Sequence, residues 1–348
     1  MAASVVTYSA VAAKLRAMYS RIPTSRDYEQ LMNKTRVSDV FLWLKDHSVY
    51  GEVLNTINES AIHRGQIERV FGKSLFNDAY SLSHMLSQND QKMLEAVLAK
   101  ADIQIIKRII RSIHTKIPID LGTVKSIDKN RRKRGAFYSE AVMMSKTYDE
   151  LAEALKNTPL YKVIKPFLAE DMTNTFELEN ALDKYYFTML SKSADAYLSG
   201  QDRKKTKEFL AAEVDMHNLL RSYRYMKYYS YSGEKMLAHL FPNQYKLTNS
   251  FWKELAESDI KNFRELAMKT KYKRIFTEED DSMWYRETSQ AMADLFKKHL
   301  REDPYNFTAV ADYIFLKEID IQNLITIIEG VRYSLEPGEI RRYLVKIK

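Results

Sequence analysis

The chain contains no cysteine among its 348 residues. This absence excludes disulfide bonds, thiolate metal sites and a cysteine nucleophile, and it fits a reducing compartment such as the cytoplasm. Glycine (9) and proline (7) are scarce, which predicts long regular elements with few turns. No apolar run approaches the roughly 18–20 residues that a membrane-spanning helix needs. We therefore do not expect the chain to cross a bilayer by itself.

The composition is otherwise that of a folded globular protein, with 45% hydrophobic and 29% charged residues. The net charge is +8, which fits a nucleic acid, an anionic membrane surface or an acidic protein as a partner. The first 26 residues carry Lys14, Arg16, Arg21 and Arg26 but no acid. This segment is either an organellar transit peptide or an amphipathic first helix that stays in place, and the repeats described below favour the helix.

Apolar residues recur at helical spacing over nearly the whole chain, and strand-like alternation is almost absent. One example begins at Leu210, Val214 and Leu220, and another at Leu316, Ile319 and Leu324. The sequence therefore predicts an all-α fold with short loops.

Two markers recur along the chain in the same order. Tyr50, Tyr161 and Tyr272 are separated by 111 residues in both intervals, and each follows a leucine by six positions. The second marker is Asp-x-x-Asn, with Ile in place of Asn in the first copy. Its members are Asp102 with Ile105, Asp215 with Asn218, and Asp320 with Asn323.

Two ordered markers at one shared period predict three copies of one helical unit. The second marker has intervals of 113 and 105 residues, so small insertions and deletions separate the copies. We expect units at residues 1–117, 118–240 and 241–348, with some helices shared across these boundaries.

No motif for catalysis, cofactor binding or metal binding is present. Gly65 and Gly72-Lys73-Ser74 have six residues between the glycines, whereas a phosphate-binding loop needs four. The seven histidines show neither a His-Glu-x-x-His pattern nor metal-ligand spacing. There is no Gly-x-Ser-x-Gly elbow. We therefore predict a non-catalytic protein without cofactor or metal.

The repeated polar positions fall within apolar helices. Asp320 and Asn323 share a helix face, and Ile319, Leu324 and Ile327 flank them. A buried Asp or Asn needs hydrogen-bond partners, because an unsatisfied one costs about 1–3 kcal/mol. A polar clamp between neighbouring helices is the favoured interpretation, and an ion or ligand site inside the bundle is the alternative.

One basic run stands out, and it consists of Lys129, Arg131, Arg132, Lys133 and Arg134 around a single asparagine. Such a run is typical of a nucleic-acid or nuclear-localisation patch, of a surface for acidic lipids or an acidic partner, or of a solvated loop. We treat it as a candidate interface.

The order of these motifs, the threefold repetition and the length resemble the family of C subunits of prokaryotic V-type ATPases, which correspond to the d subunits of eukaryotic V-ATPases. The resemblance covers essentially the whole chain. The pieces that carry it are Lys14-Leu15-Arg16-Ala17-Met18, Tyr28-Glu29-Gln30-Leu31, Glu213-Val214-Asp215, Leu240-Phe241-Pro242 and Glu318-Ile319-Asp320.

The resemblance implies a funnel of three pseudo-symmetric helical units. It also implies a place in the central stalk, between a shaft made of the D and F subunits and the membrane rotor ring. The chain would couple ATP hydrolysis or synthesis to proton or sodium transport without doing chemistry itself. It would be cytoplasmic and would approach the membrane only through the ring. The alternative hypothesis, a basic helical-repeat protein that binds nucleic acid, depends on residues 129–134.

Overall fold

The computed structural model describes residues 2–55, 64–118, 140–168, 175–242 and 246–348. Every regular element in these ranges is a helix, so the prediction of an all-α fold is confirmed. Within this part of the chain, long helices pair into three hairpins, each closed by a short turn. The hairpins are α5 (Arg64–Ser83) with α6 (Gln88–Thr115), α12 (Thr175–Tyr197) with α13 (Gly200–Tyr228), and α17 (Trp284–Glu302) with α18 (Phe307–Arg332).

Short helices precede each hairpin. They are α2 (Ser25–Met32), α3 (Val37–His47) and α4 (Gly51–Leu54) before the first; α9 (Glu140–Met144), α10 (Tyr148–Leu155), α11 (Tyr161–Ile164) and η2 (Lys165–Phe167) before the second; and α15 (Asn249–Glu257), α16 (Ile260–Met268), η3 (Lys273–Phe276) and η4 (Asp281–Met283) before the third. One short helix follows the second hairpin and another follows the third, namely α14 (Gly233–Ala238) and α19 (Pro337–Tyr343).

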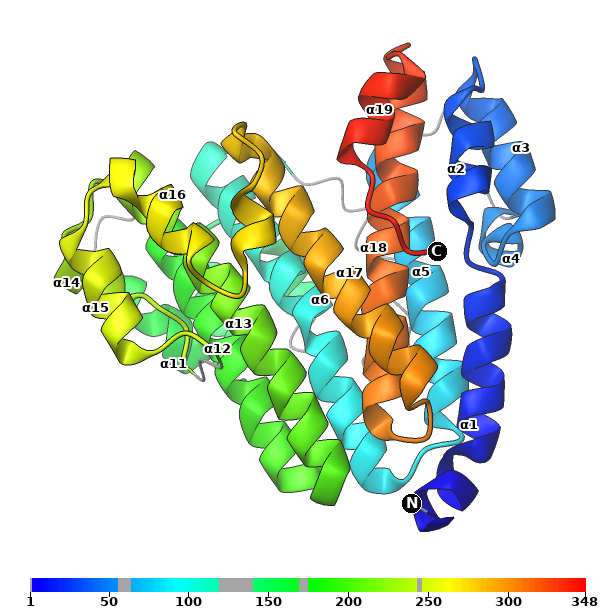
Figure 1. Cartoon of the computed structure of the whole chain (residues 1–348), viewed down its shortest axis with the longest axis horizontal. Coiled ribbons are helices and arrows are strands. Elements are labelled where there is room, and N and C mark those ends of the chain that lie inside the picture. The colour runs from blue at the N-terminus through cyan, green and yellow to red at the C-terminus, as the bar shows by residue number, and fades with distance from the viewer. Residues whose placement is uncertain (1, 56–63, 119–139, 169–174, 243–245) are drawn as a thin grey trace.

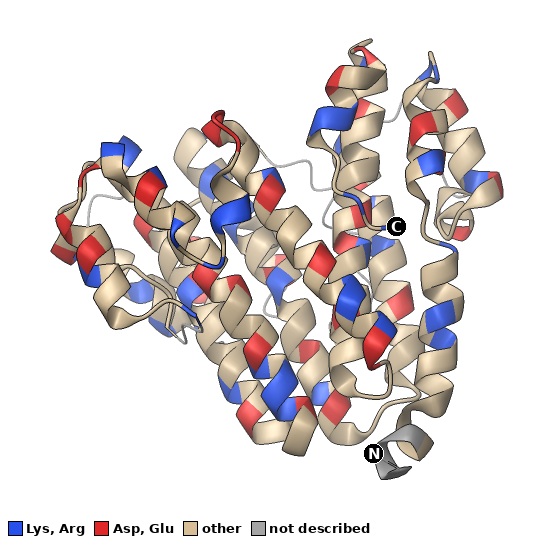
Figure 2. Cartoon of the chain, in the orientation of Figure 1, with Lys and Arg blue, Asp and Glu red and all other residues tan. Residues whose placement is uncertain are grey.

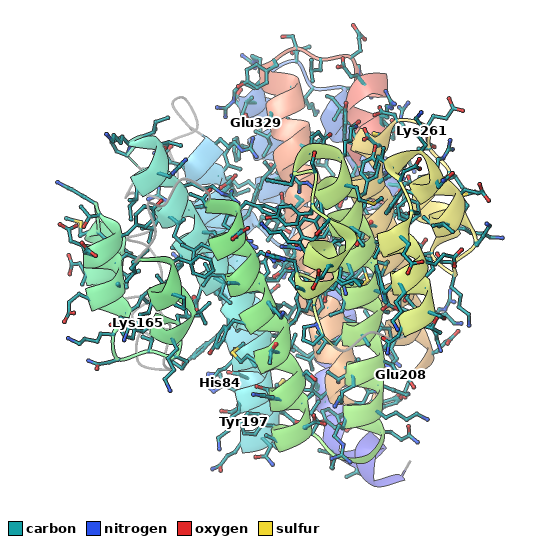
Figure 3. All side chains as sticks on the ribbon, turned by 90° about the vertical axis from the view of Figure 1, so that its left-hand side faces the viewer. His84, Lys165, Tyr197, Glu208, Lys261 and Glu329 are labelled. Atoms are coloured by element: carbon teal, nitrogen blue, oxygen red, sulfur yellow. The ribbon has the colours of Figure 1, made fainter. Side chains whose placement is uncertain are left out.

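The three hairpin turns lie together at one end of the molecule, the lower end in Figure 1. His84 and Tyr197, which flank two of these turns, are labelled near that end in Figure 3, whereas Glu329 lies near the upper end. The long helices spread apart toward the upper end, and short helices flank them on both sides of the molecule (Figure 1). The chain therefore has a narrow end made of turns and a wide end made of helix termini.

Side-chain caps define where many helices begin. Thr24 and Asp27 form a reciprocal capping box at α2, and the Asn306 side chain accepts a hydrogen bond from the Ala309 N–H at the start of α18. Each cap satisfies a backbone donor that the first helical turn leaves unpaired, which contributes about 1 kcal/mol. Ser87 caps α6 in the same way. The second helix is therefore capped in two of the three hairpins.

Helix α18 is the centre of the core. It is apolar on nearly all sides, and most of its 26 residues are buried. It packs against α17 within its own hairpin and against α5, α1 and α2 from the start of the chain. Helix α1 (Ala2–Ser20) contributes buried Val11 and Leu15 to this core. The two ends of the sequence are thus joined through one buried helix.

No helix among the described residues combines the length and the apolarity needed to cross a membrane.

Gly51 allows the chain to turn tightly after the first repeated tyrosine. A Cβ atom at this position would lie 2.4 Å from the backbone oxygen of Lys45, so Gly51→Ala should force the turn apart. We expect a loss of about 1–3 kcal/mol in the free energy of unfolding, measured by urea denaturation.

Gly72→Ala is the matched control. Nothing lies within 4 Å of a Cβ atom built on Gly72, which is inside α5, and alanine favours a helix over glycine by about 1 kcal/mol. This variant should be as stable as the wild type or more stable. Equal losses in both variants would contradict the close approach at Gly51.

Candidate functional site

The first repeated tyrosine is tied to the last repeated aspartate. Asp320 is fully buried in α18, and its two carboxylate oxygens accept hydrogen bonds from the hydroxyls of Tyr28 on α2 and Tyr50 after α3. Both tyrosines are buried as well. A buried carboxylate is costly unless it is hydrogen-bonded, so this arrangement holds the first short helices against the last long helix.

A second tie of the same type joins Tyr272 and Asp215. The Tyr272 hydroxyl lies 2.9 Å from Oδ2 of Asp215, which is fully buried in α13. The same oxygen accepts a hydrogen bond from the backbone N–H of Lys246 at 2.6 Å. Here too, an aspartate on a long helix binds segments outside that helix, one after α14 and one after α16.

The same local turn presents both tyrosines. The Tyr50 N–H donates to the hydroxyl of Ser48 at 3.2 Å, and the Tyr272 N–H donates to the hydroxyl of Thr270 at 3.1 Å. Each hydroxyl in turn donates to a carbonyl in the last turn of the preceding helix. Such side-chain turns are common where Ser or Thr ends a helix, and they fix where the tyrosine points.

The remaining tyrosine and aspartate of the two markers are not joined by a hydrogen bond among the described residues. Tyr161 is half-buried at the start of α11, and Asp102 is buried in α6. The Tyr161 hydroxyl makes no hydrogen bond to Asp102 within the described part of the chain. Its ring instead lies 5.8 Å from the ammonium of Lys165.

The two repeated asparagines make a matching pair of clamps. Asn218 donates to the carbonyl of Phe241 at 3.0 Å and accepts from the N–H of that residue at 2.8 Å. Asn323 binds Val345 in the same way, at 2.7 and 2.9 Å. Each amide therefore pins the segment that returns after the long helix. Ile105 in the first copy lacks the groups to do this.

Residues two positions before the repeated aspartates meet each other. Lys100 Nζ lies 3.4 Å from Oε2 of Glu318 and 3.7 Å from Oε1 of Glu213. These three side chains come from α6, α18 and α13, one from each hairpin. His217 joins the cluster, with Nε2 at 3.7 Å from the Glu213 carboxylate. The Lys100 side chain is 30% exposed and that of Glu318 is 27% exposed, so solvent reaches the cluster.

The charges in this cluster stabilise one another. Burial disfavours the ammonium form of Lys100, yet the carboxylates of Glu318 and Glu213 outweigh this effect and raise the pKa of Lys100. Burial likewise opposes ionisation of Glu213, but Lys100 and His217 hold the pKa of its carboxyl below the ordinary value. Lys100 and Glu213 therefore stabilise each other's charged forms.

The basic run of Lys129, Arg131, Arg132, Lys133 and Arg134 lies outside the described residues. Its candidate role as an interface therefore stays a prediction. Among the described residues, no group of His, Cys, Asp and Glu is arranged to hold a metal ion.

Sequence reasoning missed some residues that the structure brings together. Lys100, Glu213 and Glu318 each stand two residues before a repeated aspartate. This common spacing could have indicated that the three positions are equivalent. The opposite charge at that position concealed the match. Tyr28 was noted only as part of the family resemblance, because nothing in the sequence indicates that it shares Asp320 with Tyr50.

These features define the class of the protein as an all-helical scaffold whose long helices are joined by buried polar ties. A family model described as "ATP synthase (C/AC39) subunit" matches residues 11–343. The chain belongs to this family, which confirms the resemblance found in the sequence.

Relatives named as the C subunits of A-type ATP synthases match over almost the full length. The protein of Methanococcoides burtonii is 24% identical over 97% of this chain and 94% of the relative. That of Methanocaldococcus jannaschii is 24% identical over 100% and 88%. That of Halobacterium salinarum is 21% identical over 98% of both chains. The similarity is therefore low in identity but nearly complete in coverage.

Removing a tyrosine hydroxyl should weaken the ties to different extents. Tyr50→Phe leaves Oδ2 of a fully buried carboxylate without its donor, so we expect a loss of about 1–3 kcal/mol in unfolding free energy. Tyr272 is only half-buried, and Asp215 keeps the Lys246 N–H, so Tyr272→Phe should cost about 1 kcal/mol. Urea denaturation of both variants measures the difference. The opposite ranking would contradict this account.

The Asp320 carboxyl should make stability depend on pH. Burial raises its pKa from 3.8 to about 6, against the two tyrosine hydrogen bonds and Lys317, which favour ionisation. Because the folded chain holds this proton more tightly than the unfolded chain, the contribution is full below about pH 4 and is lost as the pH rises toward 6. The loss amounts to about 3 kcal/mol.

Comparing the wild type with Asp320→Asn isolates this group, because all other titrating groups are shared. The difference in unfolding free energy between the two proteins should shift in favour of the variant as the pH rises from about 4 to about 6. Parallel pH profiles would show that the Asp320 pKa is not raised.

Proposed function

We propose that this chain is the non-catalytic central-stalk subunit of a rotary ATPase of the V or A type. In this role it couples a shaft of the D and F subunits to the membrane rotor ring during ATP-driven proton or sodium transport or ATP synthesis. The observation that carries the proposal is the family match over residues 11–343. The relatives that match nearly end to end are named as subunits of such a machine.

The polar ties support three pseudo-symmetric units closed into a ring, the finer form of the fold expected from the sequence. Asp215 of the second unit holds Tyr272 of the third, and Asp320 of the third holds Tyr50 of the first. Both ties run in the same direction, from the second unit to the third and from the third to the first. Asp102 and Tyr161 make no equivalent tie between the first and second units in the described part of the chain. In an arrangement of units at 1–117, 118–240 and 241–348, the short helices of one unit would pack against a long helix of the preceding unit.

The cluster of Lys100, Glu213 and Glu318 supports the same arrangement. Equivalent positions of three related units can meet only near their common axis. Lys100 and Glu318 are partly exposed whereas Glu213 is buried, which is expected of residues at the base of a hollow. We propose that this axis is the axis of a funnel whose mouth is the wide end in Figure 1.

The wide end carries exposed aromatic side chains suited to an interface. Tyr228, Tyr285, Tyr333 and Tyr343 stand at or near the helix termini there and are 47–69% exposed. Tyrosine is enriched at protein interfaces because its ring is large and rigid and its hydroxyl can stay wet. We propose that these residues belong to the surface that meets the shaft.

The chain would perform no chemistry and need no cofactor. It would be cytoplasmic and peripheral to the membrane, with the ring as its only route to the bilayer. The proposal includes no nucleic-acid partner, and the alternative of a nucleic-acid-binding repeat protein has only residues 129–134 in its favour.

Reconstitution tests this role. Rotary complexes purified without the chain should hydrolyse ATP but fail to drive ion transport into vesicles, and adding the purified chain should restore transport. Affinity capture of the tagged chain in mild detergent should also recover the D and F subunits and the ring. Full transport without the chain, or capture of neither shaft nor ring, would overturn the proposal. Salt-sensitive retention on DNA or RNA would favour the alternative.

A further inference from the structure

A basic groove lies between α1 and α17. Its volume is about 540 Å³. Both helices pack on α18, which lies behind the groove, and the last residues of the chain form part of its wall. Figure 2 shows segments of Lys and Arg on both α1 and the lower half of α17. Its charged lining residues are Arg16, Asp294, Lys297, Lys298, Arg301 and Lys348.

Some of these cations already have partners inside the protein. Lys297 Nζ lies 2.9 Å from Asp294, which also binds Arg274. Lys348 Nζ donates to the carbonyls of Ser20 and Ile22, so its charge caps the end of α1. Neither residue is free to be the main recognition group.

Three cations of the groove have no acidic partner in the described part of the chain. Arg16, Lys298 and Arg301 make no ion pair there, and all three are exposed. Arg16 stands on one wall and the other two on the facing wall. Uncompensated charges of one sign that face each other across a groove repel, and an anion placed between them relieves that repulsion.

We propose that this groove binds an acidic peptide segment of a partner protein, with carboxylates that pair with Arg16 and Arg301. Charge complementarity supports this occupant, because guanidinium groups bind carboxylates through two parallel hydrogen bonds. The half-buried side chains of Tyr19 and Leu300, which also line the groove, would pack against the peptide. The proposal stands apart from the coupling role, since it concerns a different face of the chain.

The observations favour a peptide over a lipid surface. Membrane binding through a basic patch is usually assisted by exposed apolar side chains that insert among the lipids. None of the exposed large apolar residues of the described chain lines the groove. Within the acid-free first 26 residues, Arg16 would then have a recognition role.

A labelled oligo-glutamate peptide is the probe, and fluorescence anisotropy with the full-length chain is the measurement. We expect binding that weakens as salt is raised. Arg16→Glu/Arg301→Glu should weaken it about tenfold or more, which corresponds to the loss of two charge-assisted contacts. Arg16→Gln/Arg301→Gln removes the two charges without adding repulsion, and it should also bind the peptide more weakly than the wild type. This variant provides the test if Arg16→Glu/Arg301→Glu does not fold.

Lys253→Glu/Lys261→Glu is the matched control. Both lysines are exposed on α15 and α16, away from the groove, and the double change lowers the net charge from +8 by the same amount. This variant should bind the peptide within about twofold of the wild type. An equal loss in the two charge-reversal variants would mean that only net charge matters, and it would overturn the proposal.

Carbodiimide cross-linking locates the peptide. It should join a glutamate carboxylate to Lys298 Nζ, identified by mass spectrometry of the digested product. Cross-links confined to lysines outside the groove would contradict the site. Vesicles of phosphatidylcholine and phosphatidylglycerol test a lipid as the occupant. Vesicle binding that is lost in Arg16→Glu/Arg301→Glu, together with no peptide binding by the wild type, would replace the peptide with a membrane and overturn the proposal.

Discussion

The fold depends on one buried carboxylate. Asp320 accepts hydrogen bonds from Tyr28 and Tyr50, which are 292 and 270 residues away in the sequence. A carboxylate in the middle of an apolar helix is tolerated only where its oxygens are satisfied. This requirement draws the first short helices onto the last long helix and so joins the two ends of the chain.

The same chemistry is used again at Asp215, where a tyrosine hydroxyl and a backbone N–H take the two roles. The asparagines that follow, Asn218 and Asn323, each pin a returning segment through a pair of backbone hydrogen bonds. Hydrogen bonds require a specific geometry, so repeated polar contacts specify one relative position of the packed helices more strictly than apolar contacts would. A scaffold held by such ties supports the coupling role that we propose.

The molecule also presents two separate surfaces with different chemistry. The wide end exposes tyrosines at helix termini, whereas the groove beside α1 exposes Arg16 and Arg301, which have no acidic partner in the described part of the chain. The cluster of Lys100, Glu213 and Glu318 lies between the three hairpins and is internally compensated apart from one negative charge. The ion pairs of the central cluster stabilise the fold, whereas the unpaired cations of the groove are available to bind an anionic partner.

Helical periodicity, repeat spacing and motif order are local or linear properties of a chain, so they were enough to predict the helical class, the buried polar positions and the family. The sequence by itself did not determine which tyrosine meets which aspartate: Tyr50 binds Asp320 from the far end of the chain rather than Asp102 of its own copy. Nor did it indicate that Lys100 would face two glutamates. Partners in these contacts lie far apart in the sequence, so the packing of the long helices decides which side chains come together.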